Sequence, residues 1–454
     1  MKLRSELFEK YNKPVPRYTS YPAVPHWNEA KICKEKWRMT VKNSFEKFNN
    51  STGVSLYIHL PYCESLCTYC GCNTRITINH KVEIPYIDAL IKEFDLYLEM
   101  FGEKPNIKEI HLGGGTPTFF SPENLKTLIA SILDKCNVMP EAEFSFEAHP
   151  ANTTHEHLRV LRVLGFTRLS LGIQDFDEKI QKVINRKQSL EDVERVVEQA
   201  RSLGYKSINF DVIYGLPLQT VDSIEDTMSK VLRLMPKRIA YYSYAHVPWK
   251  HKGQRAYDEN DLPTNEAKRK LYEEGRELLE KAGYLDIGMD HFALPNDTLA
   301  KAKFNKSLHR NFMGYVSSKS DFLLGLGVSS ISDVFTGYAQ NVKSVEGYIE
   351  KINEGRLAVF KGHFMSEVDT ITKVTINEIM CNERVLVTCF SGLPVNYKLN
   401  IYQALKDLED DGLIELGENL EVTEVGRKFV RNIASVFDYR IFSEAAPQKF
   451  SMSI

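Results

Sequence analysis

The sequence lacks a long apolar run and a strong charge of either sign. None of its 454 residues lie in a stretch that approaches the roughly 18 apolar residues of a membrane span. The N-terminal MKLRSELFEKYNKP has no apolar signal core. A formal net charge of −2 provides no field that would recruit nucleic acid or an anionic membrane. With 43% hydrophobic residues the chain can bury a large core, so we expect a cytoplasmic protein of more than one domain.

Cysteine is scarce outside one loop. Cys63, Cys67 and Cys70 have the spacing C-x3-C-x2-C, and Cys72 follows after one glycine. Structural zinc sites usually take their ligands from two separated pairs, and no second pair with such spacing occurs in the chain. Neighbouring cysteines in one tight loop also form disulfides poorly. The remaining thiols are scattered, which suggests a reducing compartment: Cys33, Cys136, Cys381 and Cys389.

Three clustered thiolates are the ligands that a [4Fe–4S] cluster with one open iron requires. The loop therefore predicts a radical S-adenosylmethionine (SAM) site, with zinc or a disulfide as the alternatives.

Strand-like and helix-like segments alternate from residue 54 onward. Apolar residues at helical spacing indicate four intervening helices, which begin near Ile84, Leu125, Leu190 and Ile224. Six strand–helix units in series predict parallel strands with right-handed crossovers. Six units are too few for a closed eight-unit barrel, so we expect an open, three-quarter barrel of the α/β class. The predicted strands are residues 54–60, 107–112, 143–147, 168–174, 207–213 and 239–245.

The two ends of the chain differ from this pattern. Residues 13–25 contain four prolines and exclude a helix or a central strand, so an arm over the surface is expected. Near residue 365 the alternation stops, and residues 401–413, 413–422 and 423–437 predict a helix, a hairpin and a second helix. This order resembles a winged-helix module, but its acidic run at 407–411 would repel phosphates, so we interpret it as a lid or packing domain.

Polar residues stand where the predicted strands end, which is where parallel barrels place functional groups. The second strand enters Gly113-Gly114-Gly115-Thr116, whose glycines let main-chain groups approach a ligand closely. Each polar residue also has a purely structural interpretation, such as a strand-end cap for Glu147 and Asp211 or a surface ion pair for Arg186. Together at successive strand ends they favour a SAM site: Glu147, Gln174, Arg186, Asp211 and the segment Tyr244-Ala245-His246.

The string YIHLPYCESLCTYCGCN, with an aromatic residue before the third cysteine, resembles the oxygen-independent coproporphyrinogen III oxidases of the radical SAM superfamily. Further matches at PRYTSYP, YGLP, MDHFA, HRNF and KFS extend the similarity over almost the whole chain. One departure is His149, where the family often has Asp or Asn. The resemblance implies a three-quarter (β/α)6 barrel (51–365, with a C-terminal extension), an N-terminal arm and helix (1–50) and a mainly α-helical, winged-helix-like domain (366–454).

The resemblance also implies roles for single residues. Cys63, Cys67 and Cys70 would hold the [4Fe–4S] cluster, and Cys72 would not. Two SAM molecules are expected per chain. Tyr57, Gly114, Glu147 and Ile331 would contact the cluster-bound SAM. The second SAM would be contacted by Tyr69, Gly115, Thr116, Gln174, Arg186, Asp211 and Ala245.

The implied reaction is the oxidative decarboxylation of two propionates of coproporphyrinogen III to vinyl groups, which gives protoporphyrinogen IX. It would need a low-potential electron donor such as a flavodoxin or ferredoxin, in a monomer that binds no nucleic acid and does not span a membrane. A haem chaperone of the same superfamily, or a radical SAM enzyme for another porphyrin or haem, are the alternatives. Arg17 and Tyr21 of the arm are candidate substrate contacts. The candidate cations for the substrate carboxylates are Lys250, Lys252, Arg255, His309 and Arg310.

Overall fold

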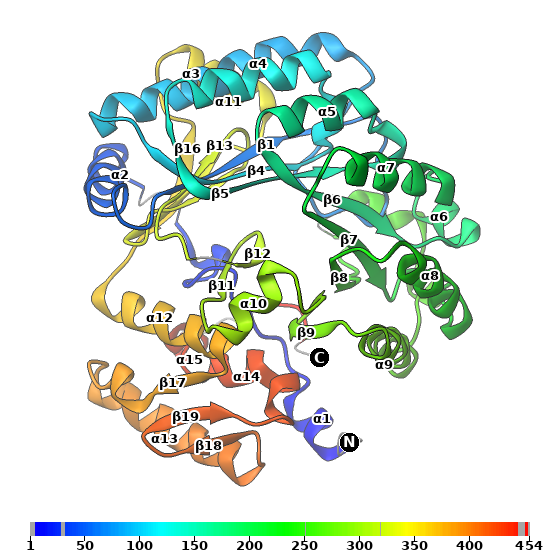
Figure 1. Cartoon of the computed structure of the whole chain (residues 1–454). Coiled ribbons are helices and arrows are strands. Elements are labelled where there is room, and N and C mark those ends of the chain that lie inside the picture. Colours follow the sequence, from blue (N-terminus) through cyan, green and yellow to red (C-terminus); the bar gives the residue numbers. More distant parts are fainter. Residues whose placement is uncertain (1–4, 29–31, 250, 318, 444–449, 453–454) are drawn as a thin grey trace.

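The computed structural model describes residues 5–28, 32–249, 251–317, 319–443 and 450–452. Its largest element is a twelve-stranded sheet with two free ends, which makes it an open barrel (Figure 1). Seven strands in its centre are parallel, in the order β13 (Leu323–Leu326), β1 (Val54–Leu60), β4 (Asn106–Gly114), β5 (Asn137–Ala148), β6 (Phe166–Gln174), β7 (Ser207–Tyr214) and β8 (Arg238–Ser243).

The six predicted strands are therefore present, and β13 adds a seventh parallel strand that the sequence did not predict. The strand predicted at 239–245 is wrong at its end. It stops at Ser243, because its partner β7 ends at Tyr214 directly opposite. Antiparallel strands extend both edges of the sheet: β14 (Ile331–Asp333), β15 (Gly337–Asn341) and β16 (Val359–Phe364) beyond β13, and β10 (His291–Ala293) and β9 (Leu285–Gly288) beyond β8.

Helices cover the convex face of the sheet (Figure 1). The four predicted helices correspond to α3 (Glu83–Phe101), α4 (Pro122–Leu133), α7 (Leu190–Ser202) and α8 (Val221–Leu234). The others on this layer are α5 (His155–Val163), α6 (Glu178–Val183), α9 (Asn265–Lys281) and α11 (Val345–Asn353).

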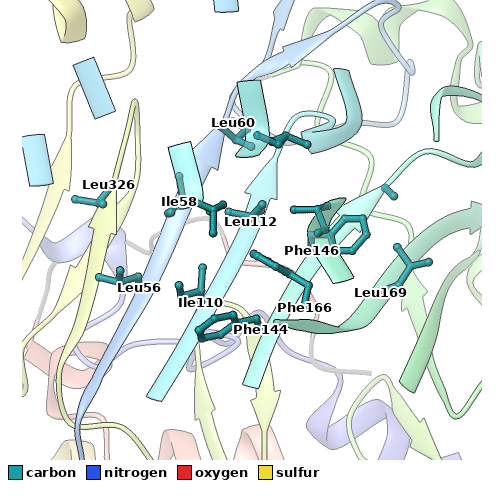
Figure 2. Packing of buried hydrophobic residues seen from close by; sticks show 14 of the residues in the cluster. Leu56, Ile58, Leu60, Ile110, Leu112, Phe144, Phe146, Phe166, Leu169 and Leu326 are labelled. Carbon is teal, nitrogen blue, oxygen red and sulfur yellow. The ribbon is translucent and has the colours of Figure 1, made fainter. Parts of the chain in front are cut away.

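The main core lies between this helical layer and the sheet (Figure 2). Along β1, Leu56, Ile58 and Leu60 are fully buried in that core. Because successive side chains of a strand point to opposite faces, Tyr57 and His59 face the concave side. Alternate residues of this strand thus stabilise the core and face the concave side of the barrel.

The concave side is covered by later parts of the chain (Figure 1). The hairpin of β11 (His309–Asn311) and β12 (Gly314–Val316) lies there with α10 (Thr298–Phe304). Behind it stand the C-terminal elements, which have a hydrophobic core of their own: α12 (Glu367–Asn382), β17 (Arg384–Leu386), α13 (Val395–Asp410), β18 (Ile414–Leu416), β19 (Asn419–Val422), α14 (Val430–Ser435) and α15 (Tyr439–Ser443).

Two predictions for this region need correction. The helix predicted at 401–413 begins at Val395 and ends at Asp410, shortly before Gly412 with its positive φ of 72°. The helix predicted at 423–437 is divided, since residues 426–429 form a 3-10 turn before α14. At Gly426 the main chain passes so close to Leu413 that a Cβ would lie 1.9 Å from its carbonyl oxygen.

The N-terminal segment contacts both parts. Helix α1 (Ser5–Tyr11) packs on the C-terminal core, whereas α2 (Lys34–Phe48) buries Trp37, Val41 and Phe45 in the main core. The proline-rich arm is extended, with one 3-10 turn at Val24–His26. In the described part of the chain no helix is both long and apolar enough to cross a membrane. The division at residues 50 and 365 stays a prediction.

Candidate active site

The cysteine loop leaves β1 at the carboxyl edge of the sheet. Cys63 lies on β2 (Tyr62–Cys63), which pairs in parallel with β3 (Arg75–Ile76) and so fixes the start and end of the loop. The Cys63 Sγ is 3.3 Å from the Thr116 Oγ1. The Cys70 amide donates to the Cys67 carbonyl over 3.1 Å. All three predicted cluster ligands are half-buried and none forms a disulfide.

Cys72 lies beside the three. Its amide is 3.4 Å from the Cys70 Sγ, and a hydrogen bond from its thiol lowers the pKa of Cys70 to about 7. Burial raises the pKa of Cys63 to about 11. Within the described residues no three His, Cys, Asp or Glu side chains are arranged to hold a single metal ion. The thiolates of a [4Fe–4S] cluster bind different irons and need not converge on one point.

The glycine run at the end of β4 is held directly against this loop. The Gly115 amide donates to the Leu60 carbonyl over 2.8 Å, and the Thr116 amide donates to the Tyr62 carbonyl over 2.9 Å. A Cβ on Gly115 would lie 2.6 Å from the Pro61 main chain. This approach is possible only without a side chain, which explains the glycine.

Glu147, at the end of β5, lies beside the glycine run. The Gly114 amide donates to its carboxylate over 3.2 Å, and the His111 Nε2 is 3.4 Å away. Burial opposes ionisation, but the hydrogen bond and charge of His111 lower the pKa of Glu147 below its usual value. The Tyr57 ring stacks on His111 with centroids 5.9 Å apart. Sequence reasoning missed His111, although its concave-facing position two residues before Gly113 on β4 was a usable signal.

Ile331 joins this group through the main chain. Tyr57 pairs with Gly325 of β13, and a Cβ on Gly325 would lie 2.5 Å from the Ile331 carbonyl oxygen. The four residues predicted for the cluster-bound SAM therefore lie on neighbouring strands of one half of the sheet: Tyr57, Gly114, Glu147 and Ile331.

Arg186 is the centre of a second group. It is 6% exposed, so it is no surface ion pair. Its Nη1 donates to the Tyr69 hydroxyl over 3.3 Å and lies 3.7 Å from the Cys67 Sγ, and its Nη2 donates to the Gly172 carbonyl. Gln174 ends β6 with a φ of 67°, and a Cβ on Gly172 would lie 2.7 Å from its amide nitrogen.

Asp211 and Ala245 complete this side of the barrel. Asp211 accepts hydrogen bonds from Ser170 (3.1 Å) and Asn209 (2.9 Å), and burial, followed by the charge of Glu147, raises its pKa to about 6. Ala245 lies past the end of β8, and its carbonyl accepts from Gln254 over 3.2 Å. Most of the second predicted group thus lies between β6 and β8 and touches the cluster loop through Arg186 and Tyr69, whereas Gly115 and Thr116 follow β4 beside the first group.

The structure separates the candidate cations for the substrate. Lys252 and Arg255 are exposed, whereas Arg310 is buried on β11. His309 lies 3.2 Å from the Asn377 amide nitrogen. Lys250 lies outside the described residues, as does the lysine of the KFS match, Lys449.

The two arm candidates also differ in position. Arg17 forms an ion pair of 2.5 Å with Asp290, while Tyr21 is 2% exposed and packs in the C-terminal core. The departure noted at His149 caps a turn, since its Nδ1 accepts from the Ala151 amide over 3.2 Å.

Comparison with known proteins agrees with this geometry. The radical SAM superfamily profile matches residues 57–231. The chain is 35% identical to the oxygen-independent coproporphyrinogen III oxidase of Pseudomonas aeruginosa, over 99% of this chain and 98% of that protein. It is 39% identical to the enzyme of the same name from Helicobacter pylori, over 95% and 96% respectively. The solved structure of Escherichia coli coproporphyrinogen III oxidase, described as a radical SAM enzyme, superposes with a TM-score of 0.90 at 33% identity, covering 97% of this chain and 99% of that one. The chain belongs to the family of oxygen-independent coproporphyrinogen III oxidases.

Proposed function

We propose that this chain decarboxylates two propionates of coproporphyrinogen III to vinyl groups without oxygen and so produces protoporphyrinogen IX. The observation that supports this most is the packing of the three-cysteine loop against Gly115 and Thr116, with Glu147 beside them, in a member of this family. Each decarboxylation removes one hydrogen atom and one electron from a propionate anion and releases carbon dioxide. The hydrogen goes to a SAM-derived radical, and the electron goes to an acceptor.

Cys63, Cys67 and Cys70 would hold the [4Fe–4S] cluster, which in its reduced form cleaves SAM and supplies a 5′-deoxyadenosyl radical. The residues of the chain then have to orient SAM and exclude water. Glu147, kept ionised by His111, would hold the positively charged part of SAM, and the lack of a side chain at Gly114 would let SAM approach the main chain. Tyr57 and Ile331, on strands on the other side of the glycine run, would line the pocket of the cluster-bound SAM.

The second group of residues would bind a second SAM. The support is the buried guanidinium of Arg186, which has no carboxylate partner among the described residues and could pair with a methionine carboxylate. The remaining contacts of this second SAM would be Tyr69, Gly115, Thr116, Gln174, Asp211 and Ala245.

We expect anaerobic equilibrium dialysis to find two SAM molecules per chain in the wild type and about one in Arg186→Ala, because the substitution removes the cation that fixes one carboxylate. The matched control is Arg159→Ala, an exposed arginine on α5, which should retain two. One SAM in the wild type would contradict the second site.

The function itself is tested by product identification. With reductant and SAM under anaerobic conditions, the protein should convert coproporphyrinogen III to protoporphyrinogen IX through a singly decarboxylated intermediate that mass spectrometry detects. Tight haem binding without any decarboxylated product, with the cluster reduced and SAM bound, would instead support a haem chaperone. If the protein converts only another porphyrin, or only haem, and leaves coproporphyrinogen III unchanged, it is a radical SAM enzyme with a different substrate.

The partners follow from the same chemistry. Reduction of the cluster requires a low-potential donor of the flavodoxin or ferredoxin kind. We further propose that the chain acts as a monomer in the cytoplasm. The arm (1–50) and the C-terminal part (366–454) would close the concave side of the barrel (51–365) over the substrate, in line with the position of the C-terminal elements in Figure 1.

A further inference from the structure

The guanidinium of Arg310 is buried with too few partners. Arg310 is 7% exposed, and among the described residues its Nε and Nη1 have no hydrogen-bond partner. Its Nη2 lies 3.5 Å from the Arg17 carbonyl, and its Cζ stands 4.7 Å from the centre of the Tyr315 ring. The ring attracts the positive charge but leaves the N–H donors unsatisfied. Buried unsatisfied donors are costly, so this position is suited to an anionic ligand that accepts hydrogen bonds.

The surroundings of Arg310 hold more cations than carboxylates. Arg17, Lys268 and Arg431 lie close to one another. Burial, followed by the charge of Arg17, lowers the pKa of Lys268 to about 8 and the pKa of Arg431 to about 10. Asp290 is the one described carboxylate that forms an ion pair with this group, and its partner is Arg17. Arg431 donates instead to main-chain oxygens of the arm and of residues 451–452. We call these four cations and Asp290 the cationic cluster.

The cationic cluster adjoins the proposed SAM sites on the concave side. Phe312, two residues after Arg310, packs edge-on against the Tyr57 ring with centroids 5.5 Å apart. Tyr242 of β8 is close enough to both regions for their charges to act on it. Burial and the charges of Asp211 and Asp290 raise its pKa, whereas the charge of Arg310 lowers it. A tetrapyrrole whose reacting carbon lies near Tyr57 would therefore have another edge within reach of Arg310.

A propionate that reacts and one that is retained place opposite demands on the protein. The reacting carboxylate gives up its negative charge when carbon dioxide leaves. An ion pair would stabilise the starting anion more than the transition state and would slow that step. A retained carboxylate keeps its charge throughout, so a strong ion pair there positions the substrate without such a penalty.

We propose that Arg310, supported by the other cations of the cationic cluster, binds a propionate carboxylate of the porphyrinogen that is not decarboxylated. This inference rests on the proposed function and adds the subsite that positions the substrate. Both coproporphyrinogen III and protoporphyrinogen IX carry the retained propionates, whereas only the former carries the reacting ones.

The test compares the binding of these two porphyrinogens. Equilibrium dialysis is performed anaerobically without SAM, and the bound ligand is quantified after oxidation to the fluorescent porphyrin. For Arg310→Gln we expect the Kd to rise about 10- to 100-fold for both porphyrinogens, because a charged hydrogen-bonded pair is lost. Iron content and SAM binding should equal those of the wild type. Arg310→Lys, which keeps the charge, should weaken both ligands by a smaller factor and replaces the Gln variant if that one does not fold.

Arg159→Gln is the control and should change neither Kd. Unchanged binding of both porphyrinogens to Arg310→Gln would overturn the inference, and weakening confined to coproporphyrinogen III would overturn it in favour of a contact with a reacting propionate. A wild-type protein that produces protoporphyrinogen IX while Arg310→Gln binds normally contradicts only this inference. A wild type that binds neither porphyrinogen contradicts the proposed function.

Discussion

Each of the single substitutions Cys63→Ala, Cys67→Ala and Cys70→Ala should abolish the cluster, so that iron falls from about four atoms per reconstituted chain to almost none. The reason is that the thiols outside the loop lie on other parts of the chain, with Cys136 just before β5 and Cys381 and Cys389 in the C-terminal part, so we expect none of them to replace a lost ligand. Iron and sulfide analysis, with electron paramagnetic resonance of the reduced protein, measures the outcome.

Cys72→Ser and Cys389→Ala are the matched controls. Cys72→Ser should keep the iron, since this residue follows the three-cysteine motif and is not part of it. Cys389 is exposed in the C-terminal part and should have no effect. A Cys67→Ala protein with a normal cluster, or a Cys72→Ser protein without one, would contradict the ligand assignment.

Glu147→Ala should lower turnover about 100-fold or more while the iron content stays normal. The carboxylate is held ionised by His111 and oriented by the Gly114 amide, and its loss removes the group that we propose fixes SAM relative to the reacting carbon. Protoporphyrinogen formation and 5′-deoxyadenosine formation are measured together.

Glu123→Ala, on the exposed face of α4, is the control for a lost carboxylate and should retain full turnover. If Glu147→Ala keeps wild-type turnover, the role assigned to Glu147 is wrong. If it loses iron as well, its role is structural.

The barrel was largely predictable because its strands carry a strong local pattern. Residues 54–60 alternate between buried aliphatic side chains and the concave-facing Tyr57 and His59, and the predicted strand matches β1 at both ends. The seventh parallel strand was not predictable in this way. Leu323–Leu326 has only four residues, and it forms a strand because it pairs in parallel with β1, which lies far from it in the sequence.

The sequence predicted residues that the structure places at the carboxyl edge of the sheet, but it did not predict their contacts. The cysteine spacing and the glycine run mark positions that only cysteine and glycine can fill. His111 gave no motif, since its effect on Glu147 depends on two strands lying side by side. The same is true of Arg310, which in sequence was one of five candidate cations. Burial on the β11 hairpin, and an Nε and Nη1 without hydrogen-bond partners among the described residues, distinguish it from the others.

The most direct test of the central claim follows a hydrogen atom. Coproporphyrinogen III deuterated at the ring-adjacent propionate carbons is incubated anaerobically with the reduced protein and SAM, and 5′-deoxyadenosine is analysed by mass spectrometry. We predict that deuterium appears in 5′-deoxyadenosine, with one such molecule formed for each vinyl group in the porphyrin product. Vinyl formation without deuterium in 5′-deoxyadenosine, or 5′-deoxyadenosine without any decarboxylated porphyrin, would contradict the account.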